Sequence, residues 1–203
     1  LMNDRPEEFA NTGLINIEKN IDKFMVAAQV LNKPVGVVYE SKYHLMVVDI
    51  CIGKNGYYTY ERIIPKIQGI AVAVLAEWSG RFFLLKQYRH ALRDWQYAIP
   101  RGFAKDGLSG KDNAVKNVIE KTGCTVSNIT YLGTTVADSG LSGTKVAVYH
   151  AKCSEPDFKY GTGNAAQLVS VKPEELKKMI HDGKVTDGFT MTALMMYLAK
   201  KTN

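Results

Sequence analysis

The first third of the chain changes from a partly helical to a strand-like pattern of hydrophobic residues. Before Pro34, apolar positions recur at partly helical spacing, namely at Ile15, Ile17, Ile21, Phe24, Met25 and Ala28. From residue 35 to residue 64 the pattern becomes that of β-strands, with residues 45–52 and 57–64 as the clearest runs. Gly53, Asn55 and Gly56 lie between these two runs and predict that they pair as a hairpin.

The rest of the chain alternates between apolar strands and amphipathic helices. Two core strands are predicted at residues 70–76 and 81–89, around the turn at Ser79 and Gly80. Further elements are strands at 130–136, 145–152 and 167–171 and helices at 112–122, 173–181 and 190–200. Because Pro65 and Gly69 separate the two patterns, we predict a helical and β-hairpin region at 1–66 and an α/β domain with a mixed sheet at 67–203.

One segment carries a motif of phosphate chemistry. Gly102, Glu120 and Gly123 stand at the spacing of the Nudix box, which reads Gly, five residues, Glu, seven residues, Arg-Glu-hydrophobic-x-Glu-Glu-x-Gly. The segment resembles this box, but its positions for the other acids and for the arginine differ from the pattern. Three positions for acids hold Leu108, Asn117 and Lys121, and the arginine position holds Lys116.

The resemblance extends to ADP-ribose pyrophosphatases of the Nudix superfamily. Residues 87–89 read Gln-Tyr-Arg at the end of a predicted strand, and Ala98 stands where that group has a further glutamate. Residues 137–150 and 182–194 resemble the loop, strand and closing helix that follow the box. The resemblance implies a Nudix α/β/α sandwich with a mixed sheet, preceded by a small N-terminal β region.

The missing acids bear on metal binding. Residues 117, 120 and 121 are three and four positions apart, so their side chains share one face of the predicted helix. Three glutamates there would give Mg²⁺ the oxygen ligands that it requires, whereas this chain offers Asn117, Glu120 and Lys121. Glu120 is thus the one retained candidate for the catalytic and metal-binding role, and any magnesium site is expected to be weak or absent. The alternative is that Asn117 and Lys121 simply belong to a solvated face.

Candidate ligand-binding residues surround the box. Arg89 and Arg101 flank it, and a guanidinium group at such a place suits a diphosphate. By resemblance Arg89 is the stronger candidate, and the alternative for Arg101 is a solvated side chain. Gly102, Phe103 and Asp138 complete the expected substrate-binding set; Phe103 could stack on a base, and the alternative is that it packs on the sheet or in a dimer interface.

These features lead to three hypotheses. The first is a Nudix-fold protein that binds a nucleoside diphosphate sugar or a related nucleotide and whose metal-dependent hydrolysis is weak or lost; the loop at 159–167 offers no further acid. The second is an active magnesium-dependent pyrophosphohydrolase in which Glu120 acts with Asp106, Asp112 or Asp138. The third is a basic regulatory or nucleic-acid-binding module on the same fold.

Charge and composition weigh against the third hypothesis. The net charge is +6 among 203 residues, and the isoelectric point is about 9.1. Glutamate at positions 98, 108, 117 and 121 would remove five positive units, because Lys121 counts twice. The altered box therefore accounts for most of the excess, and a nucleic-acid partner is not expected. No apolar run is long enough for a membrane span, and three scattered cysteines favour the reducing cytoplasm.

The composition of the hairpin at 45–64 also predicts that the protein forms a dimer. Its strands carry many apolar and aromatic residues for a two-stranded unit, which is marginal on its own. By resemblance to ADP-ribose pyrophosphatases, we expect a homodimer in which this region is buried against the partner and Arg62 lies near the partner's ligand cleft. The alternative is that residues 1–33 cover the hairpin within one chain.

Overall fold

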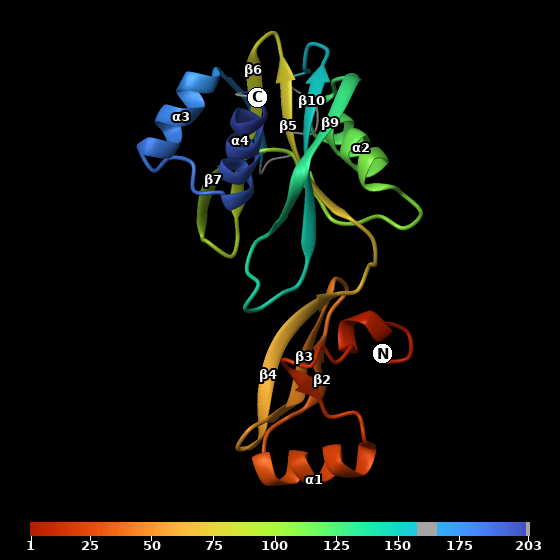
Figure 1. Cartoon of the computed structure of the whole chain (residues 1–203). Helices are drawn as coiled ribbons and strands as arrows, with labels where there is room; N and C mark the ends of the chain where they lie inside the picture. Colours follow the sequence, from red (N-terminus) through yellow and green to blue (C-terminus); the bar gives the residue numbers. More distant parts are fainter. Residues whose placement is uncertain (158–165, 202–203) are drawn as a thin grey trace. The chain divides into compact units, whose positions relative to one another are not determined.

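The computed structural model describes residues 1–157 and 166–201 and divides into two compact units (Figure 1). The first unit comprises Leu1–Lys66 and Asp138–Gly143, and the second comprises Ile67–Ala137 and Thr144–Asn203. The loop Asp138–Gly143, which the sequence placed with the second region, is thus part of the first unit. There, Leu141 accepts a hydrogen bond from the backbone of Ile63, and Gly140 accepts one from the hydroxyl of Tyr60.

The first unit is a small antiparallel sheet with one helix. Its elements are η1 (Pro6–Phe9), β1 (Asn16–Ile17), α1 (Ile21–Leu31), β2 (Gly36–Glu40), β3 (His44–Gly53) and β4 (Gly56–Pro65). β3 is central and pairs with β1, β2 and β4, and the predicted hairpin turns between Gly53 and Gly56. Gly56 has φ +118°, a conformation that favours glycine, which explains the residue at this turn.

The helix of the first unit starts later than the apolar spacing suggested. The side chain of Asn20 accepts a hydrogen bond from the backbone of Lys23 and so caps the first turn, and Asn32 ends the helix in the left-handed conformation. Residues before Asn20 contribute to the sheet and core instead: Ile17 packs with Phe9 and the central strand.

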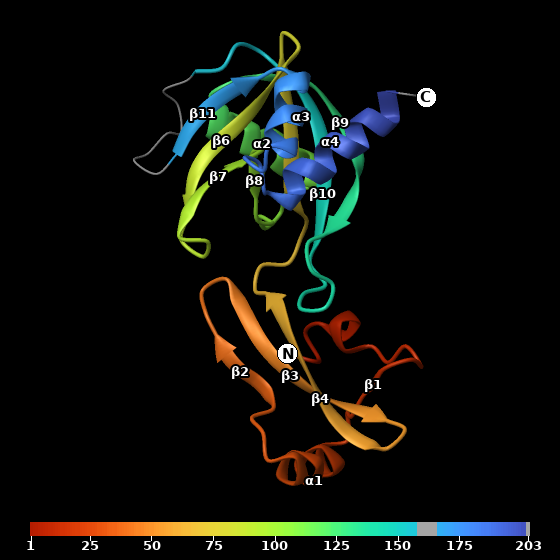
Figure 2. The same cartoon turned by 90° about the vertical axis from the view of Figure 1, so that its left-hand side faces the viewer.

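The second unit is built around a seven-stranded mixed sheet. Its strands are β5 (Ala71–Trp78), β6 (Arg81–Arg89), β7 (Asp94–Ala98), β8 (Arg101–Gly102), β9 (Val126–Val136), β10 (Lys145–Cys153) and β11 (Ala166–Val171). The main path runs β11-β6-β5-β10-β9, with β7 paired to β6 and β8 to β5 (Figure 2). β5 and β10 are parallel, and the other pairs are antiparallel.

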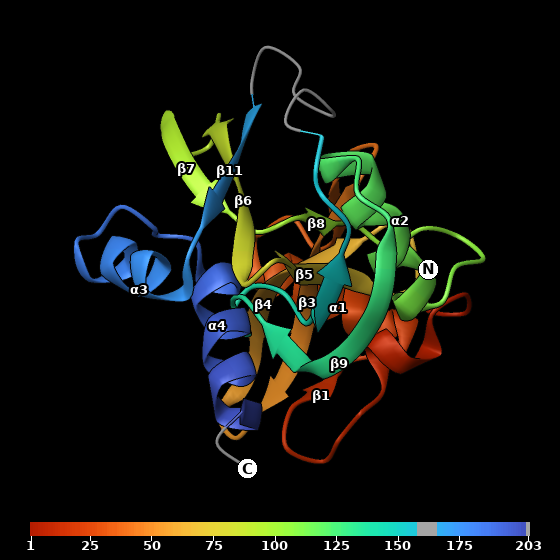
Figure 3. The ribbon, with the colours of Figure 1, turned by 90° about the horizontal axis from the view of Figure 1, so that it is seen from above.

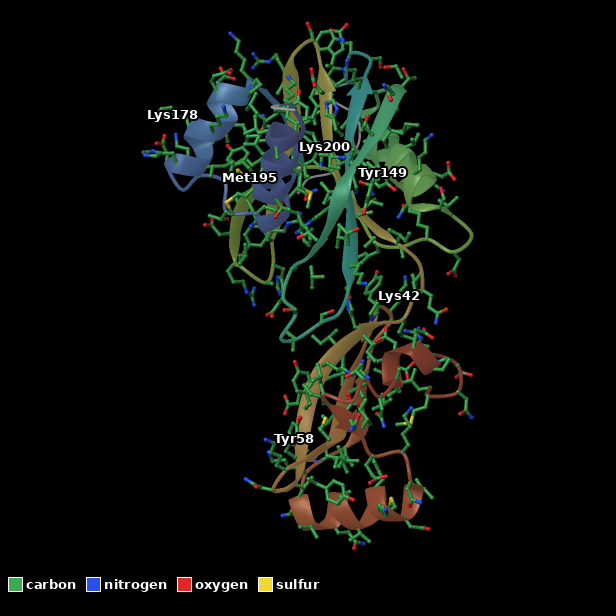
Figure 4. All side chains as sticks on the ribbon, viewed as in Figure 1. Lys42, Tyr58, Tyr149, Lys178, Met195 and Lys200 are labelled. Atoms are coloured by element: carbon green, nitrogen blue, oxygen red, sulfur yellow. The ribbon has the colours of Figure 1, made fainter. Side chains whose placement is uncertain are left out.

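Helices cover both faces of this sheet. α2 (Gly110–Thr122) packs on one face, where Val118 and Ala114 meet the sheet residues Val74 and Phe83. α3 (Pro173–His181) and α4 (Gly188–Lys201) cover the opposite face (Figure 3). Tyr149 of β10 belongs to the cluster on the α2 side (Figure 4). The predicted α/β/α sandwich with a mixed sheet is therefore confirmed for this unit. None of the helices in the described part of the chain combines the length and the apolar character of a bilayer-spanning segment.

Candidate functional site

A pocket of about 440 Å³ lies in the second unit where β6, β8, β9 and α4 come together. Two of the predicted ligand-binding residues, Arg89 and Arg101, line it. They are neighbours because β6 ends at Arg89, β7 runs back along it, and β8 then returns alongside β5 at Ala73. The remaining walls come from the residues around the β6–β7 turn, the end of β9 and the first turn of α4, namely Ala91, Leu92, Gln96, Thr135, Val136, Ala137, Asp187, Gly188, Phe189 and Thr192.

Asp187 fixes one side of the pocket. Its side chain is buried and pairs with Arg101 at 3.0 Å. The other carboxylate oxygen accepts from the backbone N–H of Thr190 at 3.0 Å and from its hydroxyl at 2.7 Å, as an N-cap side chain does. The hydroxyl of Thr190 in turn accepts from the backbone of Ile99 at 3.0 Å, which ties α4 to the turn before β8. Arg101 also stacks on Phe189, with 5.2 Å from the guanidinium carbon to the ring centre.

The positive charge of Arg89 is less well neutralised by nearby acidic groups than that of Arg101. Its Nε is buried and has no hydrogen-bond partner among the residues that the structure describes. Burial and, after it, the positive charge of Arg101 lower the pKa of Arg89, and Asp187 offsets only part of this effect. The pocket therefore presents two guanidinium groups and one buried carboxylate, an excess of positive charge that favours an anionic ligand.

The box helix α2 has a capping residue at each end. Ser109 accepts from the backbone of Asp112 and caps its start, and Gly123, with φ +69°, ends it as predicted. Asn117 is only 2% exposed, so it is not part of a solvated helix face, and that alternative is wrong for this residue. Its amide lies on Gly102, where an added Cβ would be 2.1 Å from Nδ2; the close approach explains the glycine.

One turn earlier, Asn113 reinforces the same contact between α2 and the strand segments. Its amide donates to the carbonyl oxygens of Ile70 and Phe103, at 3.0 Å each. The side chain of Phe103 itself is largely exposed.

Glu120, the retained box glutamate, is held by a lysine that the sequence did not single out. The ammonium group of Lys105 donates to Oε1 at 2.9 Å and to Oε2 at 2.8 Å. These hydrogen bonds lower the pKa of Glu120, and the positive charges of Lys105, Lys116 and Lys121 add to the effect against some burial. The carboxylate is therefore ionised and already paired.

Comparison with solved structures connects this arrangement to a known fold. A structure described as "Crystal structure of ADP compounds hydrolase", which is a Nudix enzyme, matches with a TM-score of 0.71 and 16% sequence identity, over 82% of this chain and 90% of that chain. The chain has a Nudix fold. No family model matches the sequence, and the search of curated proteins finds no match.

The box residues do not fit the divalent metal that Nudix hydrolases generally use. Of the three positions on this face of α2, Asn117 offers a neutral amide that is buried against Gly102, and Lys121 carries a positive charge. The third, Glu120, already forms a salt bridge with Lys105. Mg²⁺ requires several oxygen ligands, and an ammonium group within a few ångströms repels it. In the described part of the chain, no three His, Cys, Asp or Glu side chains converge as metal ligands.

Two of the three acids of the rearranged-site hypothesis accept hydrogen bonds from their own loops or caps. Asp112 accepts from the hydroxyl of Ser109 at 2.5 Å within the cap of α2. Asp138 accepts from the backbone of Gly140 at 3.0 Å in the loop of the first unit, and Asp106 is exposed. The loop at 159–165, expected to lack a further acid, lies outside the described residues.

Arg62, expected near a partner's cleft, has a local role in the first unit. Its Nε donates to Asp49 at 2.6 Å, its Nη1 donates to Glu8 at 3.1 Å, and its guanidinium group stacks on Phe9 at 4.8 Å. These contacts hold η1 against the hairpin, so the described residues already supply Arg62 with partners.

The sequence analysis did not single out Asp187 and Gln96, which line the pocket, or Lys105, which pairs with Glu120. A signal for Asp187 did exist, because an aspartate three residues before Thr190 and ahead of an apolar run is a typical helix start. Gln96 donates to Thr186 at 3.1 Å, and neither it nor Lys105 belongs to a sequence pattern that announces its contact.

Proposed function

We propose that the protein binds a nucleoside diphosphate sugar or a related nucleotide diphosphate in the Arg89–Arg101 pocket, with metal-dependent hydrolysis weak or lost. The observation that carries the proposal is the convergence of two guanidinium groups in one pocket of a Nudix fold, while Lys105 neutralises the retained box glutamate. The solved structure of similar fold is described as an ADP compounds hydrolase, which supports ADP-containing ligands as the first class to test.

The two halves of the proposal have separate physical grounds. Guanidinium groups bind phosphate oxygens through paired N–H donors, and Arg89 has a buried Nε that makes no hydrogen bond to residues 1–157 or 166–201. Hydrolysis of a diphosphate needs an activated water and neutralisation of the developing charge, which box acids and metals supply in Nudix enzymes. A single carboxylate already bound to an ammonium group does not provide a comparable site.

Calorimetric titration with ADP-ribose tests the binding half. We expect saturable one-to-one binding, and at a hundred times the dissociation constant the ligand should stabilise the protein by about 2.7 kcal/mol. Hydrolysis is then followed with Mg²⁺ and with Mn²⁺, where turnover below about 1 s⁻¹, the low end of ordinary enzymes, is expected. Absence of binding to ADP-ribose, ADP and a nucleoside diphosphate sugar would refute the first half, and faster turnover would refute the second.

We also propose that the protein is a homodimer, with the first unit as the dimerisation region. Several large apolar side chains of this unit are exposed, among them Ile21, Met25 and Val30 of α1 and Tyr58 of β4 (Figure 4). Apolar side chains that gather on a surface support an interface with a second copy. The cytoplasm remains the expected compartment on the sequence evidence alone.

Light scattering at micromolar concentration tests the assembly, with a mass near twice 22.6 kDa expected. The double variant Met25→Glu/Val30→Glu should shift the mass toward that of the monomer, because dimerisation would bury the two new carboxylates without partners, which is energetically unfavourable. A matched double change on exposed polar residues of α3, Lys177→Glu/Lys178→Glu, should leave the mass unchanged. A monomeric mass for the unaltered protein would contradict the proposal.

A further inference from the structure

Lys105 holds both oxygens of the retained box glutamate with a single ammonium group. Its Nζ lies 2.9 Å from Oε1 and 2.8 Å from Oε2 of Glu120; the side chain of Lys105 is half-buried, at 33% exposure, and that of Glu120 is exposed, at 42%. An ammonium group carries three N–H donors and no acceptor. Two donors face the carboxylate, so the third is left for another acceptor.

The charges around this pair favour an anion over a second cation. The positive charges of Lys116 and Lys121, in the same helix, also act on Glu120, in addition to that of Lys105. A divalent cation at Glu120 would have to displace Lys105 and would then be repelled by the charges of Lys116 and Lys121 as well. A phosphate group, by contrast, is attracted by the net positive charge that remains.

Lys105 lies on the chain segment that follows Arg101, one of the residues that line the pocket. Lys105 follows Arg101 and Gly102, and the backbone at Gly102 is packed against Asn117, three residues before Glu120 in α2. Asn113 fixes this segment again through the carbonyl oxygen of Phe103. The loop that carries Lys105 is therefore anchored to both β8 and α2.

We propose that Lys105 is a built-in cation that takes the place of the divalent metal at the box and donates to a phosphate oxygen of the bound ligand. The ligand is a nucleotide diphosphate, so the inference rests on the proposed function. It goes beyond that function because recognition of the phosphates then requires no metal ion and uses a lysine outside the box pattern.

Binding in the presence and absence of metal tests the role of Lys105. ADP-ribose is titrated into the protein with excess EDTA and with millimolar Mg²⁺, for the unaltered chain, Lys105→Gln and Lys111→Gln. Lys111 is an exposed lysine in the first turn of α2, so its variant is matched in charge and chemistry. We expect equal affinity of the unaltered protein in both buffers and about tenfold weaker binding for Lys105→Gln in EDTA, with Lys111→Gln within twofold. Equal loss in both variants, or a requirement for Mg²⁺, overturns the proposal.

Manganese uptake gives a readout that is independent of the nucleotide. The electron paramagnetic resonance signal of free Mn²⁺ falls when the ion is bound, and we expect no specific uptake by the unaltered protein. Stoichiometric uptake that disappears in Glu120→Gln would show that Glu120 serves a metal ion, and the proposal would be wrong whether or not ADP-ribose binds.

The two proposals fail in different ways. If ADP-ribose, ADP and the nucleotide sugar all fail to bind, the proposed function is wrong, and inorganic pyrophosphate replaces them in the same EDTA titrations. If Lys105→Gln then binds pyrophosphate about tenfold more weakly than the unaltered protein, the result would still support Lys105 as the built-in cation that binds phosphate. No dependence on Lys105 for any of these probes overturns it.

Discussion

Replacing Asp187 by alanine is expected to lower the free energy of unfolding of the second unit by about 3 kcal/mol. The carboxylate is 3% exposed and serves three donors, namely Arg101, the backbone of Thr190 and the hydroxyl of Thr190. Loss of an N-cap costs about 1 kcal/mol, and removal of one partner of a buried ion pair costs about 3–5 kcal/mol when the other is fully buried. Arg101 is 31% exposed, so solvent reduces the second contribution.

Denaturant unfolding followed by tryptophan fluorescence measures this effect. Trp78 and Trp95 both belong to the second unit, so the signal reports on the part of the chain that contains Asp187. Asp182→Ala is the matched control, because Asp182 forms an i, i+4 pair with the exposed Lys178 and should contribute less than about 1 kcal/mol. Equal effects of the two changes would contradict the buried-network interpretation.

The isosteric change Asp187→Asn separates the two contributions. The amide oxygen retains the cap on α4, whereas the charge opposite Arg101 is lost. We therefore expect a destabilisation between those of Asp182→Ala and Asp187→Ala. An asparagine variant as unstable as the alanine variant would assign the whole effect to the ion pair.

The fold was predictable where local chemistry and periodicity agree. The hairpin β3–β4 has two strand-forming runs rich in apolar and aromatic residues and a glycine turn, and the predicted helix at 173–181 matches α3, which begins at Pro173. β7, by contrast, was not predicted. Its residues Asp94 and Trp95 are exposed, so the strand has no continuous apolar run that a sequence pattern could reveal. It forms because its backbone pairs with β6 between Leu85 and Arg89.

The candidate site was predictable in part, for a similar reason. Resemblance pointed to Arg89, and Arg101 was a second candidate from its place beside the box; the structure brings both to one pocket through the turn between β6 and β7 and the return of β8. Asp187, the partner of Arg101, lies at the start of a helix far along the chain, and such a pairing leaves no periodic signal. The same holds for Lys105, a single lysine in a loop whose contact with Glu120 exists only once α2 has packed against Gly102.

Replacing Arg89 by methionine is expected to weaken ADP-ribose binding at least tenfold, or about 1.4 kcal/mol, without loss of stability. Burial and the nearby Arg101 lower the pKa of Arg89, which means that the folded state already disfavours its charge. Its buried Nε has no hydrogen-bond partner in the described part of the chain, so the change removes no hydrogen bond of that atom there. Methionine keeps an apolar stem of similar length, and the free energy of unfolding should stay unchanged or rise by about 1 kcal/mol.

Arg81→Met gives the opposite expectation and serves as the matched control for Arg89→Met. Arg81 donates to the hydroxyl of Ser170 at 2.9 Å, to the carbonyl oxygen of Ser170 at 2.7 Å and to Glu175 at 3.3 Å, and it does not line the pocket. Its loss should destabilise the second unit by about 1–2 kcal/mol while binding stays within twofold. Calorimetry and fluorescence-monitored unfolding on the same samples decide the matter. If Arg89→Met binds ADP-ribose as tightly as the unaltered protein does, the guanidinium group of Arg89 does not contact the phosphates. The ligand would then be bound elsewhere.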